Sequence, residues 1–200
     1  MPISYEHNLI FIHIPKNAGT SITRAFRMEN SGHWDVEATS RHYSEEWNDY
    51  HKFCIVRNPL DRFISCYKYA KMRRSYYHVS HKGFVGERGR HPDYETLSNK
   101  SFDECIGLFF NKKLKHRGWL PQSNWVCDKN GFALDEFVKM EELPRVFKGV
   151  KVPFLNKSKS HVRRTVEERI DYFYDEDMAN KIETAYADDF ALFNYEKTCK

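Results

Sequence analysis

Residues 11–21, FIHIPKNAGTS, place a lysine, a glycine and two hydroxyl side chains in one short segment. A glycine loop between a strand and a helix binds phosphate, because free backbone N–H groups and the positive end of the helix dipole converge on the anion. The order differs from that of an ATP-binding loop, GxxxxGK[ST], since Lys16 precedes Gly19 and no lysine stands before Thr20. The segment therefore predicts a phosphate site unlike that of a kinase.

A second strand and helix repeat this arrangement. KFCIV at 52–56 is typical of a buried strand, and Asn58 followed by Pro59 predicts the start of a helix over 60–72. In a nucleotide kinase the second strand ends in an aspartate that holds the metal ion, but here it ends in Arg57. Arginine cannot ligate magnesium and suits phosphate. We therefore expect a ligand that carries phosphate at two places and needs no metal.

The two motifs resemble those of sulfotransferases that use 3′-phosphoadenosine 5′-phosphosulfate (PAPS), especially the carbohydrate-type family 2 group related to heparan and chondroitin sulfotransferases. HIPKNAGTS at 13–21 differs from the family's HIPKTAGTS at Asn17, and VRNPLDRFISCY at 56–67 fits VRNPxxRxxSxY throughout. The similarity extends to segments 120–126, 137–143, 155–159 and 186–195. It implies transfer of a sulfuryl group from PAPS to an acceptor hydroxyl by metal-independent in-line displacement, leaving adenosine 3′,5′-bisphosphate.

The resemblance also implies roles for individual residues. Lys16 would contact the sulfate and its bridging oxygen, and Arg57 and Ser65 would bind the 3′-phosphate, although a structural salt bridge is the alternative for Arg57. Arg62 is expected in an intramolecular ion pair. The remaining residues implied in cofactor binding are Asn17, Ala18, Gly19, Thr20 and Ser21 in the first loop, and Asn156, Lys157 and Ser158, which would close over the 3′-phosphate.

A general base is needed to remove the proton of the acceptor hydroxyl, and histidine is best matched near neutral pH. The resemblance puts the base between the two motifs, which leaves His33, His42 and His51. His42 follows Arg41 in SRHYSEE, similar to the RH segment that supplies the family's base, so His42 is predicted to be catalytic together with Lys16. The alternative is that His42 is an ordinary exposed histidine.

Strands that alternate with helices predict an α/β, P-loop-like three-layer fold with a central parallel sheet flanked by helices, in a single domain over 1–200. The predicted strands are 8–14, 52–56 and 136–140, with a hairpin at Asn130-Gly131. The predicted helices have Thr20 or Ser21, Asn58 and Ser101 as N-caps, and two more follow within 165–193. A connection with one helical turn at 44–47 is expected over 29–50, and Trp119, Trp125, Phe109 and Phe110 are expected in the core.

Composition limits the remaining classes. The chain has 200 residues, a net charge of +4 and five cysteines without CxxC spacing, so neither a disulfide framework nor a zinc site is indicated. No apolar run is long enough to span a membrane and no signal peptide is recognisable. We expect a soluble, cytoplasmic enzyme, or one of the Golgi lumen if this is a trimmed catalytic domain. The sequence does not indicate the oligomeric state.

The expected partner is a hydroxyl-bearing acceptor, a glycan or glycoconjugate by the resemblance, and not nucleic acid. Two other functions remain open. One is a P-loop kinase-like phosphotransferase, which the missing GK[ST] disfavours. The other is a nucleic-acid-binding module that uses the basic, tyrosine-rich stretch 68–91, although no DNA- or RNA-binding motif accompanies it. The same stretch could instead guide an anionic acceptor or be a solvated loop.

Overall fold

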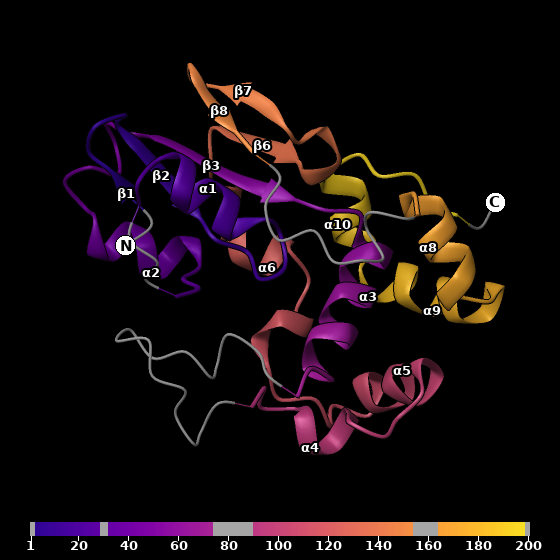
Figure 1. The fold of residues 1–200 in the computed structure, drawn as a ribbon. Coiled ribbons are helices and arrows are strands. Elements are labelled where there is room, and N and C mark those ends of the chain that lie inside the picture. The colour runs from indigo at the N-terminus through magenta and orange to yellow at the C-terminus, as the bar shows by residue number, and fades with distance from the viewer. Residues whose placement is uncertain (1–2, 29–31, 74–89, 154–163, 199–200) are drawn as a thin grey trace.

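A mostly parallel sheet lies at the centre of the computed structural model, which describes residues 3–28, 32–73, 90–153 and 164–198 (Figure 1). Its strand order is β1-β2-β3-β6. The strands are β1 (Ile3–Ser4), β2 (Leu9–Ile12), β3 (His51–Val56) and β6 (Glu136–Lys139). β2, β3 and β6 are parallel to one another, whereas β1 pairs with β2 in antiparallel fashion. The loops that follow the three parallel strands therefore meet at one edge of the sheet.

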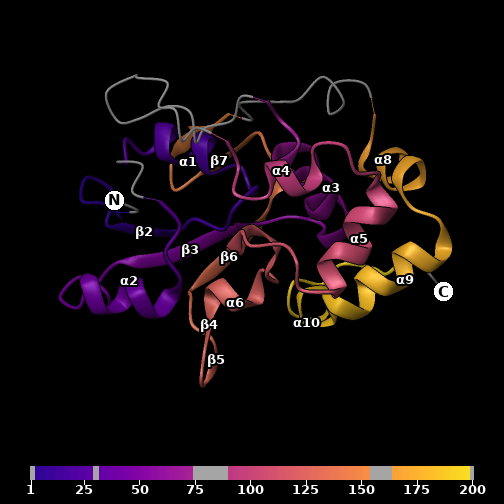
Figure 2. The ribbon, with the colours of Figure 1, turned by 90° about the horizontal axis from the view of Figure 1, so that it is seen from below.

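Helices cover both faces of this sheet (Figure 2). Side chains alternate along a strand, so Ile10 and Ile12 point to one face while Leu9 and Phe11 point to the other. The first face packs against residues of α2 (Val36–His42) and α6 (Ser123–Val126). The second packs against α1 (Gly19–Ala25) and the hairpin of β7 (Arg145–Phe147) and β8 (Val150–Val152). The predicted α/β class with a sheet flanked by helices is confirmed.

A separate apolar cluster joins the remaining helices, and Figure 1 shows α8 and α9 beside α3. These helices are α3 (Pro59–Ala70), α5 (Phe102–Phe110), α8 (Val166–Phe173), α9 (Glu176–Ala185) and α10 (Ala187–Leu192). Shorter elements are α4 (Tyr94–Leu97), the 3-10 turns η2 (Arg117–Trp119) and η3 (Met140–Glu142), and the hairpin of β4 (Cys127–Asp128) and β5 (Gly131–Phe132).

Local capping signals were reliable predictors. The side chain of Asn58 accepts hydrogen bonds from the N–H groups of Leu60 (3.0 Å) and Asp61 (3.3 Å), so α3 starts where the sequence predicts. Ser101 and Glu104 form the predicted capping box of α5. The three predicted strands also form, at slightly different lengths.

Several predicted elements were wrong. The first helix begins at Gly19, with Ala18 at the capping position, and not at Thr20 or Ser21. A helix that was not predicted, α2, lies between the two motifs, because the side chain of Asp35 caps it through the N–H of Ala38 (2.9 Å). The expected turn at 44–47 is also present, with the N–H of Trp47 donating to the carbonyl of Tyr43 (2.8 Å). The two C-terminal helices form as α8 and α9, and a third helix that was not predicted, α10, follows them. The hairpin turn lies one residue before the predicted one.

Side-chain burial agrees with most of the expected core. Trp119 and Trp125 are buried, whereas Phe110 is 46% exposed and was wrongly expected inside. The cysteines within the described ranges are free thiols, namely Cys54, Cys66, Cys105 and Cys127. Among the helices of those ranges, none has the length and apolar character needed to cross a membrane.

Candidate active site

The loop after β2 takes an unusual backbone path. Lys16 and Ala18 have φ angles of 73° and 55°, in the left-handed region that residues other than glycine rarely adopt. In the described part of the chain, the N–H groups of Ala18, Gly19 and Thr20 have no hydrogen-bond acceptor. Consecutive unpaired N–H groups at a helix start favour an anionic ligand. Backbone strain of this kind is typical of binding sites.

Gly19 is required by a close approach rather than by its own φ angle. A Cβ atom at this position would lie 1.7 Å from Nε2 of His13, the side chain that follows β2. The imidazole of His13 therefore occupies the space of the missing side chain. The glycine of the motif is explained by packing inside the motif itself.

Asn17 fixes the loop to the end of the neighbouring strand. It is fully buried, and its Nδ2 donates to the carbonyl of Ile55 (2.8 Å) and to Oε1 of Gln122 (2.6 Å). Gln122 in turn accepts from the N–H of Arg57 and donates to its carbonyl, both at 2.9 Å. The side chain of Asn17 thus points into the protein, so only its backbone is available to a ligand.

The ammonium group of Lys16 lies against α3, 3.8 Å from the ring centroid of Tyr69. The pKa of Lys16 is lowered from 10.5 to about 8, mainly by burial and also by the nearby Arg57, against an opposing effect of Cys66. Lys16 is still mainly protonated at neutral pH. The loop cation is therefore held in place and can lose its proton at mildly alkaline pH.

Arg57 belongs to the second motif and contacts the first. Its Nη1 donates to the carbonyl of Lys16 (3.3 Å), while Nε and Nη2 contact Oδ2 of Asp61 at 2.8 and 2.7 Å. The ion pair that was the alternative reading of Arg57 is thus present. It does not exclude phosphate binding, because a guanidinium group has five N–H donors. Ser65 is half-buried one helical turn after Asp61 and one before Tyr69, so it shares the face of α3 that meets the loop.

Arg62 was predicted to form an ion pair, and this was wrong for the part of the chain that is described. Its guanidinium is buried and donates to three carbonyl groups, those of Pro15 (3.2 Å), Leu120 (2.9 Å) and Gly118 (2.8 Å). Backbone carbonyls satisfy a buried guanidinium without a carboxylate. Arg62 therefore anchors the loop just before Lys16.

The other residues predicted in cofactor binding have different outcomes. Ser21 is buried and Thr20 half-buried at the start of α1, and the N–H of Ser21 donates to the carbonyl of Ala18 (2.8 Å). Asn156, Lys157 and Ser158 lie outside the described residues, as does most of the basic stretch 68–91. Their predicted roles stay predictions.

His42 lies at the end of α2 with an exposed side chain. Its ring is 4.9 Å from that of Trp34, and the two residues line a shallow hollow with Ala38 and Arg41. Glu46, four residues after His42, accepts a hydrogen bond from the hydroxyl of Tyr5. Among the described residues, the ring contacts of His42 are with Trp34 and Tyr43 and not with the first motif.

His33 lies directly against the first motif. Its ring centroid is 4.3 Å from that of His13, and Nδ1 is 2.9 Å from the carbonyl oxygen of His13. A carbonyl can only accept, so Nδ1 carries the proton and Nε2 keeps its lone pair. Burial lowers the pKa of His33, and the charges of Lys16, Arg62 and Arg117 act in the same direction against its hydrogen bond to His13. The imidazole is therefore neutral near pH 7.

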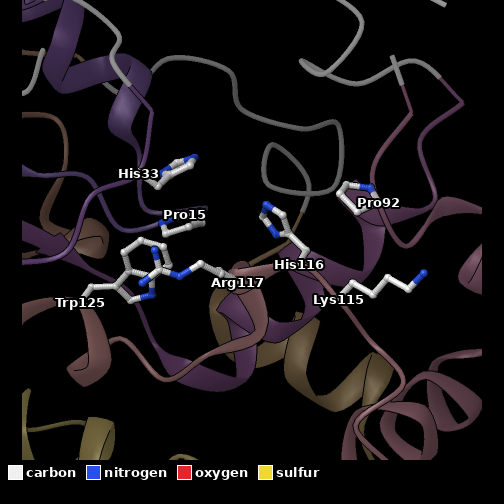
Figure 3. A pocket seen from close by; sticks show the side chains of 7 residues that line it. All are labelled: Pro15, His33, Pro92, Lys115, His116, Arg117 and Trp125. Atoms are coloured by element: carbon white, nitrogen blue, oxygen red, sulfur yellow. The ribbon is translucent and has the colours of Figure 1, made fainter. Parts of the chain in front are cut away.

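A hollow of about 320 Å³ opens beside this histidine (Figure 3). Its lining consists of Pro15, His33, Pro92, Lys115, His116, Arg117 and Trp125. The guanidinium of Arg117 lies 4.5 Å from the ring centroid of Trp125 and also contacts Asp35 at 2.8 Å. The hollow thus brings a neutral imidazole and cationic side chains next to Pro15, the residue before Lys16.

His116 contributes a second neutral imidazole to the lining. Its Nδ1 accepts from the N–H of Gly118 (3.0 Å), so the proton is on Nε2. Burial lowers its pKa to about 4, helped by the neighbouring His91 and His33. The buried carboxylate of Asp93 holds this segment by accepting from the N–H groups of Lys115 (2.6 Å) and His116 (3.1 Å).

A comparison with models of protein families assigns the chain to a family. The model of the sulfotransferase family matches residues 1–196, nearly the whole chain. The chain belongs to sulfotransferase family 2. No curated protein and no solved structure matches it. Membership of the family supports sulfotransfer as the general activity, and the resemblance recognised from the two motifs is confirmed.

Sequence reasoning missed two residues that organise the site of this sulfotransferase. Gln122 joins Asn17 to Arg57, and Arg169 holds both carboxylate oxygens of Asp61 at 2.7 Å. A signal for Arg169 existed, since it lies on the apolar stripe of Val166, Ile170 and Phe173, where an arginine must find a partner. For Gln122, the only signal in the sequence is its position in LPQSNWV at 120–126, one of the segments that resemble the family.

Proposed function

We propose that this protein transfers a sulfuryl group from PAPS to a hydroxyl of an acceptor, a carbohydrate by the family resemblance, and releases adenosine 3′,5′-bisphosphate. One observation carries the proposal. Lys16 and Arg57 follow two neighbouring parallel strands, and the guanidinium of Arg57 donates to the carbonyl of Lys16. Two cations held together at one edge of the sheet suit a nucleotide with two phosphate positions.

The residues present fit such a donor. The unpaired N–H groups of 18–20 and the ammonium of Lys16 suit the 5′-phosphosulfate, while Arg57 and Ser65 suit the 3′-phosphate. PAPS supplies an activated sulfuryl group that passes to the acceptor oxygen by in-line displacement. No metal ligand is needed for this charge pattern, because Arg57 stands where a kinase has its metal-binding aspartate.

Lys16 would act on the leaving group. Its ammonium is held against Tyr69 at 3.8 Å, so it is positioned before the ligand arrives. Negative charge grows on the bridging oxygen as the S–O bond breaks, and a fixed cation stabilises that charge more than it stabilises the ground state. Asn17 supports this role by anchoring the loop to β3.

Two histidines compete for the role of general base. His42, the sequence-based prediction, is exposed on α2 beside Trp34. The surroundings of His33 favour it instead, because its Nδ1–H is bound to the carbonyl of His13 and its Nε2 lone pair is on the ring that lines the hollow. We propose that the general base is a histidine, and variants of His33 and His42 distinguish between the two.

The hollow beside His33 is the proposed acceptor site. Lys115 and Arg117 offer cationic donors, and the buried Trp125 holds Arg117 in place by packing against its guanidinium group. A hydroxyl that enters here would meet the base and the loop of Lys16 from one side. This makes a hydroxyl-bearing glycan a suitable acceptor.

The test compares thermal unfolding of the protein with adenosine 3′,5′-bisphosphate and with AMP, followed by transfer of labelled sulfate from PAPS to a panel of glycans. We expect a clearly larger rise in Tm with the bisphosphate and label on at least one glycan. Equal stabilisation by the two nucleotides would contradict PAPS as the donor. Label transfer to phenols or steroids alone would contradict the carbohydrate acceptor while keeping the reaction.

A further inference from the structure

We infer that Arg169 is a positioning residue for nucleotide recognition, acting through Asp61 on Arg57. This inference rests on the proposed function, because it concerns how the 3′-phosphate is distinguished. Arg169 belongs to α8, more than a hundred residues after the second motif, and is only 4% exposed. It belongs to neither motif, and its contacts lie with the second motif rather than with the hollow.

The contacts form a chain of three charged side chains. Nε of Arg169 donates to Oδ1 of Asp61 and Nη2 donates to Oδ2, both at 2.7 Å, which is the two-point geometry that orients a carboxylate. Oδ2 then also accepts from Nε of Arg57 at 2.8 Å. Arg169 thus fixes the carboxylate, and the carboxylate fixes the guanidinium of Arg57.

The charges explain why two arginines are needed. Burial alone would raise the pKa of Asp61, but Arg57 and Arg169 together hold it at about 2. If Asp61 faced Arg57 alone, the pair would be neutral and would have little attraction for an anion. With Arg169 included, the three groups carry a net positive charge, so Arg57 stays electropositive toward a phosphate although it is paired.

Arg169 also holds the backbone at the start of α8. Its Nη1 donates to the carbonyl of Arg164 at 2.7 Å, and Arg164 precedes Thr165, the N-cap of α8. One guanidinium therefore contacts both Asp61 of the second motif and the backbone at Arg164. This double contact is more than helix packing alone requires.

The experiment measures Kd by calorimetry for adenosine 3′,5′-bisphosphate and for AMP. The ratio used is the Kd for AMP divided by the Kd for the bisphosphate, so a high ratio means a strong preference for the bisphosphate. We expect Arg169→Gln to lower this ratio about tenfold or more, the effect of one misplaced charge-assisted hydrogen bond, while the Kd for AMP stays nearly constant. Arg169→Lys keeps the charge but not the two-point contact, and should recover part of the loss. In an Arg57→Ala background, Arg169→Gln should have no further effect on the ratio.

A matched control separates positioning from stability. Tyr174 is buried just after α8, and its hydroxyl donates to the carbonyl of Leu60 at 3.1 Å, next to Asp61. Tyr174→Phe should lower Tm and leave the ratio unchanged. A ratio that survives Arg169→Gln, or falls equally in Tyr174→Phe, would overturn the inference. A wild-type protein that does not distinguish the two nucleotides would overturn the proposed function first, and this inference with it.

Discussion

Nη1 of Arg57 lies 3.3 Å from the carbonyl oxygen of Lys16, so the second motif directly supports the backbone of the first. The two residues are 41 positions apart and meet because β2 and β3 are parallel neighbours. Lys16 needs such support, since its φ of 73° is costly for a residue with a side chain. Because of this contact, the residue predicted to bind the 3′-phosphate also supports the loop predicted to bind the 5′-phosphosulfate.

Arg57→Ala should remove the ability to distinguish adenosine 3′,5′-bisphosphate from AMP. Each charge-assisted hydrogen bond to the 3′-phosphate should contribute about 1.5 to 3 kcal/mol to binding of the bisphosphate and nothing to AMP. Thermal unfolding with each nucleotide measures the difference. Arg145→Ala is the control, because Arg145 pairs with Glu142 near the surface and should not affect the difference. A variant at Arg57 that still prefers the bisphosphate would reassign the 3′-phosphate site.

Lys16→Ala should lower kcat more than it raises the KM for PAPS, because the ammonium is proposed to act mainly on charge that develops during transfer. The pH dependence gives an independent check. The pKa of Lys16 is lowered to about 8, so the cation is present below that pH and is lost above it. The rate should therefore fall on the alkaline side.

Lys16→Arg keeps a cation at all accessible pH values. This variant should lose the alkaline decline even if its maximal rate is reduced. Steady-state kinetics between pH 6 and about 9.5 on the best acceptor provides the measurement. A decline that persists in Lys16→Arg would assign it to another group, and a pure KM effect of Lys16→Ala would assign the lysine to ground-state binding.

Gly19→Ala should destabilise the protein and abolish nucleotide binding. The added methyl would meet Nε2 of His13 at 1.7 Å, which forces either the imidazole or the helix start to move. Overpacking of this kind costs about 1 to 3 kcal/mol in unfolding free energy. Chemical denaturation measures the loss. The double variant Gly19→Ala, His13→Ala should recover stability, and failure to recover would show that the clash is not with His13.

Much of the fold could be predicted because its signals are local. Each signal involves residues that are close together in the sequence. Examples are the cap at Asn58-Pro59, the capping box of Ser101 and Glu104, and the short apolar runs of the strands. The cap of α2 was present as Asp35 but lies in a polar segment without clear periodicity, so the helix was missed. Local signals thus predict where a helix starts more reliably than they predict whether a polar segment is helical.

The site was predictable only as far as its motifs reach. Both motifs stand next to the strands that bring them together, and family resemblance covers them. Two residues that fix Arg57 come from distant chain segments: Gln122 bonds to its backbone, and Arg169 pairs with its partner Asp61. No spacing rule joins them to the motif. The same holds for His33, whose contact with His13 spans 20 residues. Tertiary contacts decided which polar residues meet.

The last prediction separates the two candidate bases. If His33 is the base, His33→Ala should keep the affinity for adenosine 3′,5′-bisphosphate and lower kcat by a factor on the order of 10² to 10⁴, since only proton removal is lost. Because burial lowers the pKa of His33 below 6.5, the imidazole stays unprotonated to lower pH, and the acidic limb of kcat/KM should lie below that value. The limb should vanish in His33→Ala.

His42→Ala and His51→Ala are measured beside it. His51 is bound to Glu136 at 3.2 Å and serves as the matched control, with near-normal transfer expected. Under the alternative, His42→Ala alone loses turnover while His33→Ala keeps it, which would restore the sequence-based prediction. Loss in both variants with nucleotide affinity intact would mean that the acceptor site extends from the hollow beside His33 to the exposed end of α2. Near-normal turnover in both would exclude a histidine from this segment, and a carboxylate would then be sought among residues 32–50.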